Sequence, residues 1–451
     1  MSQQRNATEQ AVNHLLASHL SGQISRRQLL RRAAAIGVSA PMLAAVLGHT
    51  GARTAMAQEG PPAADAPLQL GNYDGRTLSV SVALQETEVS VFEDVIIKGF
   101  EEATGGEVEV VKIEAADVVK TLQAQVQSGN IEIDLLTQDN NSLAPLVANQ
   151  LVEPIPNAEE IMPPTIIPAL KEVLQFDGQY YFLPARPNVQ ITYFNENRFN
   201  EWGVQPPKTW DELMAAAKTI QEKAGVGKVS IQGVPGGAVG VTVTQFLWQA
   251  GADPLKINSP EAVQAFQYLQ SLKPYLTPQY PTATFDTTNT YILNESVALA
   301  QNWPFGVNVI VDEGGKKEVK TYSGWAGPAG QFHVLGGDVF GVVKGTENKD
   351  MALDFARYFM SKPVQEQLTA QLGWPAVRED AFGAVEEWQQ PYFESIKEAL
   401  THVKARPNVT YWGEVENILT DAFNDIVTGG KEVQPTLDSY QQQIDQLVAA
   451  G

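Results

Sequence analysis

The chain has 451 residues, of which 43% are hydrophobic and 18% are charged, and it contains no cysteine. This composition excludes a membrane-embedded protein and a disordered one, and the length favours two domains over one. The absence of cysteine excludes disulfides, thiolate metal sites and cysteine nucleophiles. The net charge of −21 disfavours contact with nucleic acid and with anionic lipid, but it is compatible with a cation-binding protein.

The first 57 residues have the pattern of a twin-arginine export signal. Arg26 and Arg27 lie in the run SRRQLLR, and an apolar run follows at 33–48. That run is short for a membrane-spanning helix, and the small residues that end at Ala57 fit cleavage by a signal peptidase. We therefore predict export of the folded protein by the Tat translocase to a periplasmic or other extracytoplasmic location. A flexible spacer is expected at 58–75, which is rich in Pro, Ala, Gln and Gly.

Cleavage after Ala57 would change the balance of charged and histidine residues. It would remove six arginines and one acid, leaving 25 basic and 51 acidic residues. His333 and His402 would be the only histidines left, so a histidine metal cluster or a histidine general base would have to use one of these two. We expect no metal and no cofactor.

Strands and helices are expected to alternate from residue 76 onward. Apolar residues at every second position indicate a strand at 77–84, and a third strand is expected at 133–136. This alternation favours a parallel sheet covered by helices, in which ligands bind at the carboxyl ends of the strands. The loops after these two strands are therefore candidate ligand-binding segments. Their candidate residues are Gln85, Glu88, Asp139 and Asn140.

The stretch 177–213 is predicted to cross from one lobe to another. Two prolines, Pro184 and Pro187, interrupt a run of aromatic and β-branched residues that favours extended structure. A capping box that begins at Thr209 then predicts the start of a helix that belongs to the second lobe. The polar residues between the prolines and the next strand are candidates for ligand contact, although an interdomain salt bridge would also explain the arginine. They are Arg186 and Asn188.

Sequence motifs of enzymes are largely absent. The chain has no G-x-S-x-G, H-E-x-x-H, phosphate-loop or calcium-loop motif. We therefore predict that the protein is not an enzyme. An exported glycosidase stays open as an alternative, because so many carboxylates offer many possible acid pairs.

Four of the eight tryptophans lie in loops or beside helix breaks. Indole faces stack on the apolar faces of pyranose rings, and neighbouring polar side chains bind the sugar hydroxyls. Packing in a hydrophobic core is the competing explanation for each of them, because Trp is largely buried on average. The candidates are Trp303, Trp325, Trp374 and Trp412.

The chain from residue 76 to 451 resembles the extracellular solute-binding proteins of ABC importers, the family that includes maltose-binding protein. The likeness rests on DGQYY at 177–181, YFN at 193–195, PPKTWDEL at 206–213 and the glycine pair at 336–337. It implies an α/β periplasmic-binding-protein fold, with two lobes of helix-flanked sheets, a hinge and a cleft for a ligand of sugar size. It also adds Gly337 and Asp338 to the candidate site.

The resemblance further implies a division of the chain and a function. Lobe 1 is expected at 76–184 and 326–373, and lobe 2 at 185–325 and 374–451. We predict a monomeric substrate-binding component that binds an oligosaccharide or other polyol and delivers it to the transmembrane subunits of an ABC permease. A polyamine- or cation-binding protein on the same scaffold is the first alternative. It predicts a cleft with several acids and few uncharged polar groups.

Overall fold

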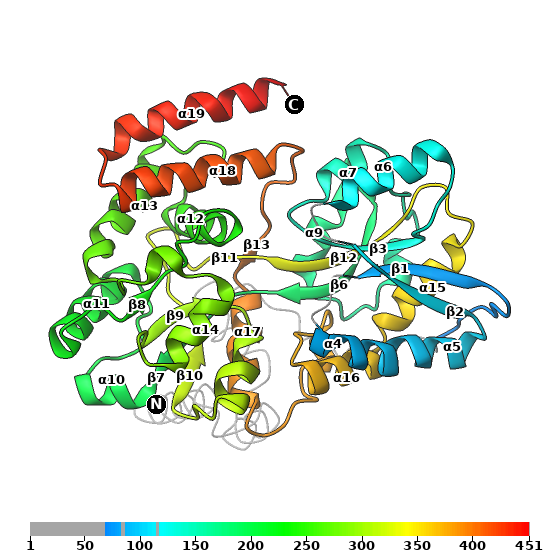
Figure 1. Ribbon diagram of the computed structural model, residues 1–451, viewed down its shortest axis with the longest axis horizontal. Coiled ribbons are helices and arrows are strands. Elements are labelled where there is room, and N and C mark those ends of the chain that lie inside the picture. Colours follow the sequence, from blue (N-terminus) through cyan, green and yellow to red (C-terminus); the bar gives the residue numbers. More distant parts are fainter. Residues whose placement is uncertain (1–67, 83–85, 114–116, 451) are drawn as a thin grey trace, which may run out of the picture. The chain divides into compact units, whose positions relative to one another are not determined.

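The computed structural model describes residues 68–82, 86–113 and 117–450 (Figure 1). All of them belong to one compact unit, Ala64–Gly451. The predicted export signal, the start of the predicted spacer and Gln85 lie outside the described residues. Among the helices of the described residues, none combines the length and the apolar character that crossing a membrane requires.

A five-stranded sheet, in the order β2-β1-β3-β12-β6, forms the centre of the first lobe. β1 (Thr77–Val82) pairs in parallel with β2 (Glu107–Lys112) and with β3 (Leu135–Asp139). β12 (Gly336–Val342) runs antiparallel to both β3 and β6 (Phe182–Asn188). The carboxyl ends of β1, β3 and β6 therefore lie at the same edge of the sheet as the start of β12.

Helices cover both faces of this sheet (Figure 1). On one side lie α4 (Glu86–Val91), the π-helix η1 (Phe92–Ile97), α5 (Lys98–Thr104), α15 (Lys349–Phe359) and α16 (Lys362–Leu372). On the other lie α6 (Val118–Ser128), α7 (Ala144–Ala148) and α9 (Pro168–Val173). The lobe also holds α8 (Ala158–Ile161), β4 (Gln175–Phe176), β5 (Gln179–Tyr180) and η6 (Glu379–Ala381).

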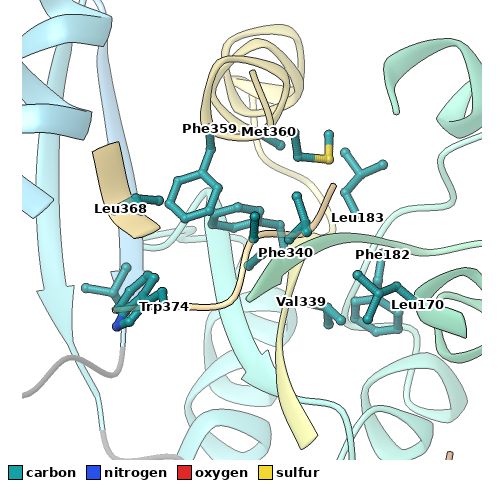
Figure 2. Packing of buried hydrophobic residues seen from close by; sticks show 14 of the residues in the cluster. Leu170, Phe182, Leu183, Val339, Phe340, Phe359, Met360, Leu368 and Trp374 are labelled. Atoms are coloured by element: carbon teal, nitrogen blue, oxygen red, sulfur yellow. The ribbon is translucent and has the colours of Figure 1, made fainter. Parts of the chain in front are cut away.

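Aromatic side chains fill the core between β12 and the helices α15 and α16. Phe340 of β12 packs against Phe359 of α15 with ring centroids 5.0 Å apart, in an edge-to-face arrangement. Figure 2 shows these two rings side by side and Trp374 beside the same core. Trp374 thus joins the hydrophobic core to the edge of the sheet where β12 begins.

The second lobe is built on a four-stranded sheet in the order β10-β7-β9-β8. β7 (Ile191–Asn195) is antiparallel to β10 (Val319–Tyr322) and to β9 (Leu299–Asn302), whereas β8 (Val229–Ser230) is parallel to β9. Its longer helices are α10 (Glu196–Trp202), α11 (Trp210–Ala224), α12 (Gly237–Ala250), α13 (Pro260–Leu272), α14 (Phe285–Leu293), α17 (Gln390–Leu400), α18 (Trp412–Phe423) and α19 (Val433–Ala450). Short helical turns are η3 (Lys273–Tyr275), η4 (Tyr280–Thr282), η5 (Asn308–Glu313) and η7 (Asn424–Thr428). These two helix-flanked sheets confirm the predicted α/β fold class, but each sheet is mixed, because β12 and β7 run antiparallel to their neighbours, whereas parallel sheets were expected.

The start of α11 shows how local sequence sets a helix end. Thr209 accepts a hydrogen bond from the backbone N–H of Glu212 at 3.2 Å, as the capping box predicts. The Glu212 carboxylate accepts instead from the backbone N–H of Lys208, at 2.7 Å. The reciprocal bond therefore reaches one residue before the cap, and the two bonds together fix the angle at which the chain enters α11.

Backbone hydrogen bonds place the lobe boundaries differently from the prediction. The segment from residue 326 to β11 (His333–Val334) belongs to the second lobe, because Ala326 donates to the Lys208 carbonyl and Ala329 to the Gln249 carbonyl. Residues 374–380 belong to the first lobe, because Ile167 donates to the Val377 carbonyl and Glu379 to the Thr165 carbonyl. Residues 185–188 also belong to the first lobe, as the last part of β6. Pairing between distant segments, and not local pattern, sets these limits.

The described end of the predicted spacer is part of the first lobe. The backbone N–H of Gly71 donates to Asp354 of α15 at 2.8 Å, and the Tyr73 hydroxyl donates to the same carboxylate oxygen at 2.7 Å. Tyr73 is only 5% exposed and stacks on Phe100. Residues 68–75 are therefore attached to the fold, which corrects the expectation that they belong to a flexible spacer.

His333 is buried where the chain passes from the second lobe to the first. It lies in β11, which pairs in parallel with β13 (Val403–Lys404), and its side chain is fully inaccessible to solvent. Its Nε2 atom lies 3.0 Å from the side-chain amide nitrogen of Gln331. Burial, with a smaller contribution from His402, lowers the pKa of His333 to about 3. His333 is therefore neutral in the folded protein at neutral and mildly acidic pH.

Mild acid is expected to destabilise the protein through His333. The unfolded chain, with a histidine pKa of about 6.5, binds more protons than the folded protein between pH 6.5 and pH 3, so stability falls as the pH is lowered through that window. We expect this residue to reduce the free energy of unfolding by about 2 kcal/mol between pH 7 and pH 5. Denaturant titrations of the wild type and of His333→Gln at both pH values measure the difference. Equal losses in the two proteins would contradict a depressed pKa.

Candidate functional site

Most of the predicted site residues of the first lobe meet at one edge of its sheet. β3 and β6 end at this edge and β12 begins there, and the register pairs Asp338 with both Asp139 and Arg186. Glu88 comes to the same place from α4, which follows β1. The residues gathered here are Glu88, Asp139, Asn140, Arg186, Asn188, Gly337 and Asp338.

Arg186 forms the centre of the first group of contacts. Its Nη2 and Nε atoms donate to one Asp338 carboxylate oxygen at 2.8 and 3.1 Å, and its Nη1 lies 3.5 Å from Glu88 Oε1. The guanidinium carbon lies 4.5 Å from the ring centre of Trp374, whose indole N–H donates to the same Glu88 oxygen at 2.8 Å. Arg186, Glu88 and Trp374 therefore form a closed ring of contacts, with a cation–π interaction as one side, and Asp338 is joined to this ring through Arg186.

The electrostatics of this group follow from its burial. Burial acts to lower the pKa of Arg186, but the carboxylates of Asp338 and Glu88 outweigh it and raise that pKa. Burial raises the pKa of Asp338, even though Arg186 acts in the opposite direction. Arg186 thus stays charged, and its charge partly offsets the effect of burial on the pKa of Asp338.

Arg406 forms the centre of a second group, which connects the two lobes. Its Nη2 atom donates to Asp139 Oδ1 at 3.0 Å and to Asn140 Oδ1 at 3.1 Å, both in the first lobe. Its Nη1 lies 3.5 Å from Glu416 Oε1, in α18 of the second lobe. The Arg406 side chain is 5% exposed and that of Glu416 is 11% exposed. This arginine therefore ties a sheet edge of one lobe to a helix of the other with little contact with water.

The two groups are continuous because Asp139 and Asp338 are register partners on β3 and β12. The charge of Asp139 accordingly contributes to raising the pKa of Asp338 and of Glu416, in both cases after burial itself. We call the resulting line of acidic and basic side chains the charge row. It consists of Glu88, Arg186, Asp338, Asp139, Arg406 and Glu416.

An edge of the second-lobe sheet carries uncharged polar side chains. Gln190 precedes β7, Gln232 follows β8 and Asn302 ends β9, and all three are buried. Gln190 donates to Gln232 at 2.8 Å, Gln232 to Asn302 at 3.2 Å, and Asn302 to Asn289 at 2.6 Å. We call this set the amide cluster. Together with a neighbouring pair joined at 2.8 Å, it consists of Gln190, Gln232, Asn302, Asn289, Gln245 and Gln301.

The four candidate tryptophans are placed differently. Trp374 contacts Arg186 and Glu88, as described above. Trp303 follows β9 and is 8% exposed, and its ring lies so close to the first residue of β12 that a Cβ on Gly336 would be 2.8 Å from it. Trp325 and Trp412 are each 1% exposed and lie in the core of the second lobe. The structure therefore brings Trp374 and Trp303 to the polar edges and places the other two where packing explains them.

Sequence reasoning did not single out Arg406, Glu416 or the amide cluster. Gln232 follows β8 and Asn302 ends β9, so the rule that selected Asp139 finds them only once the ends of these two strands are known from the structure. No such signal identifies Arg406 or Glu416. The first-lobe partner of Arg406, Asp139, lies more than 260 residues away in the sequence, and Glu416 lies within the helix α18 and not at a strand end.

The cavities beside the charge row have small volumes. Two cavities that adjoin Arg186 measure about 20 and 10 Å³, enough for about one water molecule each. A ligand pocket usually measures about 300–1,000 Å³, so neither cavity has room for a ligand of sugar size. A hollow of about 680 Å³ beside Arg76 and Asp350 lies at the opposite edge of the first-lobe sheet, where β1 begins, and is far from this chemistry.

Comparison with protein families identifies the family to which the chain belongs. The family described as bacterial extracellular solute-binding protein matches residues 96–393, which include Asp139, Arg186, Asp338 and the amide cluster. The chain belongs to this family. Solute-binding proteins of this kind act outside the cytoplasm.

Individual relatives agree with this assignment. The arabinooligosaccharide-binding protein of Halalkalibacterium halodurans is 24% identical over 422 residues, covering 82% of this chain and 91% of that protein. The sn-glycerol-3-phosphate-binding periplasmic protein UgpB of Brucella melitensis is 22% identical over 311 residues, covering 61% and 69%. The structure of maltose-bound MalE3 from T. maritima superposes with a TM-score of 0.72 at 20% identity and covers 82% of this chain and 99% of that one. The first two of these relatives are named as binding proteins.

Gly337 is expected to be essential for the edge where β12 begins. Its φ of +105° is unfavourable for other residues, and a Cβ there would lie 1.9 Å from the Arg186 carbonyl oxygen. We expect Gly337→Ala to lower the free energy of unfolding by about 2 kcal/mol or more. Gly383→Ala is the matched control, because a Cβ at that exposed turn meets nothing within 4 Å. Similar denaturant midpoints for the two variants would contradict the close approach of the two strands.

Proposed function

We propose that this protein is the substrate-binding component of an ABC importer, that it binds an oligosaccharide or other polyol between its lobes, and that it delivers the ligand to a membrane permease. The observation that carries the proposal is the convergence of Trp374, paired carboxylates and arginines at one sheet edge, together with a second sheet edge rich in amides. Aromatic faces and fixed polar groups are what a polyhydroxylated ligand requires. The named ligands of the relatives, an arabinooligosaccharide and maltose, support the same class.

The proposed mechanism involves binding and hinge closure without chemistry. Separation of the lobes would break the contacts of Arg406 with Asp139 and Asn140 and open the edge of β12 to solvent. A ligand that contacts both lobes would stabilise the closed form, which the transmembrane subunits of the permease would recognise. The proposal includes the predicted export by the Tat translocase and a monomeric state.

The uncharged polar groups favour a polyol over a polyamine. The polyamine alternative predicts several acids and few uncharged polar groups, whereas the amide cluster supplies amides at the edge of the second-lobe sheet. The carboxylates of the charge row are also in contact with arginines, which reduces their capacity to hold ammonium groups. The same pairing disfavours a glycosidase, in which one carboxyl group must stay protonated and another must reach the substrate.

A calorimetric screen with maltose, maltotriose and arabinotriose tests the proposal directly. We expect at least one neutral oligosaccharide to bind with a Kd in the micromolar range or below, about −8 kcal/mol or stronger. Spermidine serves as the competing ligand class. Absence of binding heat with every sugar, together with clear binding of spermidine, would contradict the carbohydrate assignment.

Trp374 is expected to contribute to ligand affinity. Trp374→Ala removes the ring that stacks on Arg186 and the indole N–H that holds Glu88, so affinity for the bound oligosaccharide should fall by about tenfold or more. Trp388→Ala is the matched control, because its indole bonds to the exposed Glu386. Trp303→Ala, at the other polar edge, should also weaken binding. Equal affinities for the wild type and a folded Trp374→Ala variant would remove this residue from the site.

A further inference from the structure

Both arginines of the charge row are already paired with acids. Arg186 contacts Asp338 at 2.8 Å and Glu88 at 3.5 Å, and Arg406 contacts Asp139 at 3.0 Å and Glu416 at 3.5 Å. Arginine recognises phosphate and carboxylate ligands through pairs of parallel N–H groups on its planar fork. In both side chains these groups already point at protein carboxylates.

The remaining hydrogen-bonding capacity suits hydroxyl groups. Among the described residues, the Nε atom of Arg406 has no hydrogen-bond partner. The Asp139 side chain is 42% exposed, whereas those of Glu88 and Asp338 are 17% and 20% exposed. A sugar hydroxyl can donate to a carboxylate and accept from a lone N–H, so it can use both kinds of group without separating an ion pair.

An anionic ligand would meet an unfavourable charge balance. The charge row holds four carboxylates and two arginines, so a phosphate or uronate would add negative charge to a site that already has an excess of it. To form two parallel hydrogen bonds with Arg186 it would have to displace Asp338 or Glu88, whose side chains are 20% and 17% exposed, and the displaced carboxylate would lose its partner with little contact with water. Leaving one member of a buried ion pair without its partner costs several kcal/mol.

We propose that the ligand of this site carries no negative charge, and that the two-acid pairing of each arginine is the feature that rejects phosphorylated and acidic sugars. This inference rests on the proposed function, since it assumes that the charge row contacts the ligand. The inference predicts a different ligand class from that of the relative named for binding sn-glycerol 3-phosphate. Sequence identity does not decide between the two classes, because this relative is 22% identical and the arabinooligosaccharide-binding protein is 24% identical.

Calorimetry with matched neutral and anionic probes tests the inference in the protein isolated after export. The neutral probes are maltose and arabinotriose, and the anionic probes are sn-glycerol 3-phosphate and a galacturonic acid trimer. We expect the wild type to bind the anionic probes about 100-fold more weakly than the best neutral probe. Binding of either anionic probe with a Kd within about tenfold of the best neutral Kd would overturn the inference.

Glu416→Gln tests the cause. It leaves Arg406 with one carboxylate instead of two, so the ratio of neutral to anionic affinity should fall by about tenfold. Glu414→Gln is the matched control: it makes the same change of charge at an exposed position of the same helix and should leave the ratio unchanged. An equal ratio in Glu416→Gln and Glu414→Gln would also overturn the inference.

Two further results separate this inference from the proposed function. If Glu416→Gln does not fold, as judged by its thermal transition, Asp338→Asn makes the same test at Arg186. If the wild type binds spermidine and no sugar, and also rejects both anionic probes, the carbohydrate assignment fails while the rejection of anions stands. If it binds sn-glycerol 3-phosphate tightly, the inference fails and transport of a polyol derivative stands.

Discussion

The contacts of Arg406 are the interaction on which the arrangement of the two lobes depends. A guanidinium group that is almost without solvent contact is held by Asp139 and Asn140 of one lobe and by Glu416 of the other. Buried ion pairs of this kind contribute little net stability compared with apolar packing, but loss of one partner is costly. Their value in a two-lobed protein is specificity of position: the bonds to Asp139 and Asn140 form only when the lobes approach in one orientation, whereas the bond to Glu416 is kept within one lobe.

Sheet topology decides why polar side chains gather beside this arginine. In the first lobe, β3 and β6 end where the antiparallel β12 begins, so one edge collects side chains from three segments far apart in the sequence. In the second lobe, β8 and β9 end where β7 begins, and amides collect there. The two edges differ in chemistry: one carries charged side chains, and the other carries amides, which both donate and accept hydrogen bonds.

Much of the fold and part of the site follow from local pattern. Alternating apolar residues at 77–84, together with the glycines and prolines that end helices, identify the αβ alternation, and the polar residues after β3 identify Asp139 and Asn140. Tryptophan positions alone do not separate ligand contact from packing: Trp374 and Trp325 both lie in loops, but one stacks on Arg186 and the other is in a core. Lobe boundaries at 326 and 374 were misplaced, because the bonds from Ala326 to Lys208 and from Ile167 to Val377 join segments that share no local signal.

The amino-acid sequence by itself determined the class of protein, the alternation of strands and helices, and the polar loop residues that lie at strand ends, because these depend on periodicity, turn residues and composition over short stretches. Only the tertiary structure decided that Arg186 and Arg406 are each shared between two acids, and that residues 68–75 belong to the first lobe. The physical reason is that the energy of a charged group depends on its burial and on partners within a few ångströms, and the fold brings these partners together from positions as far apart as Asp139 and Arg406.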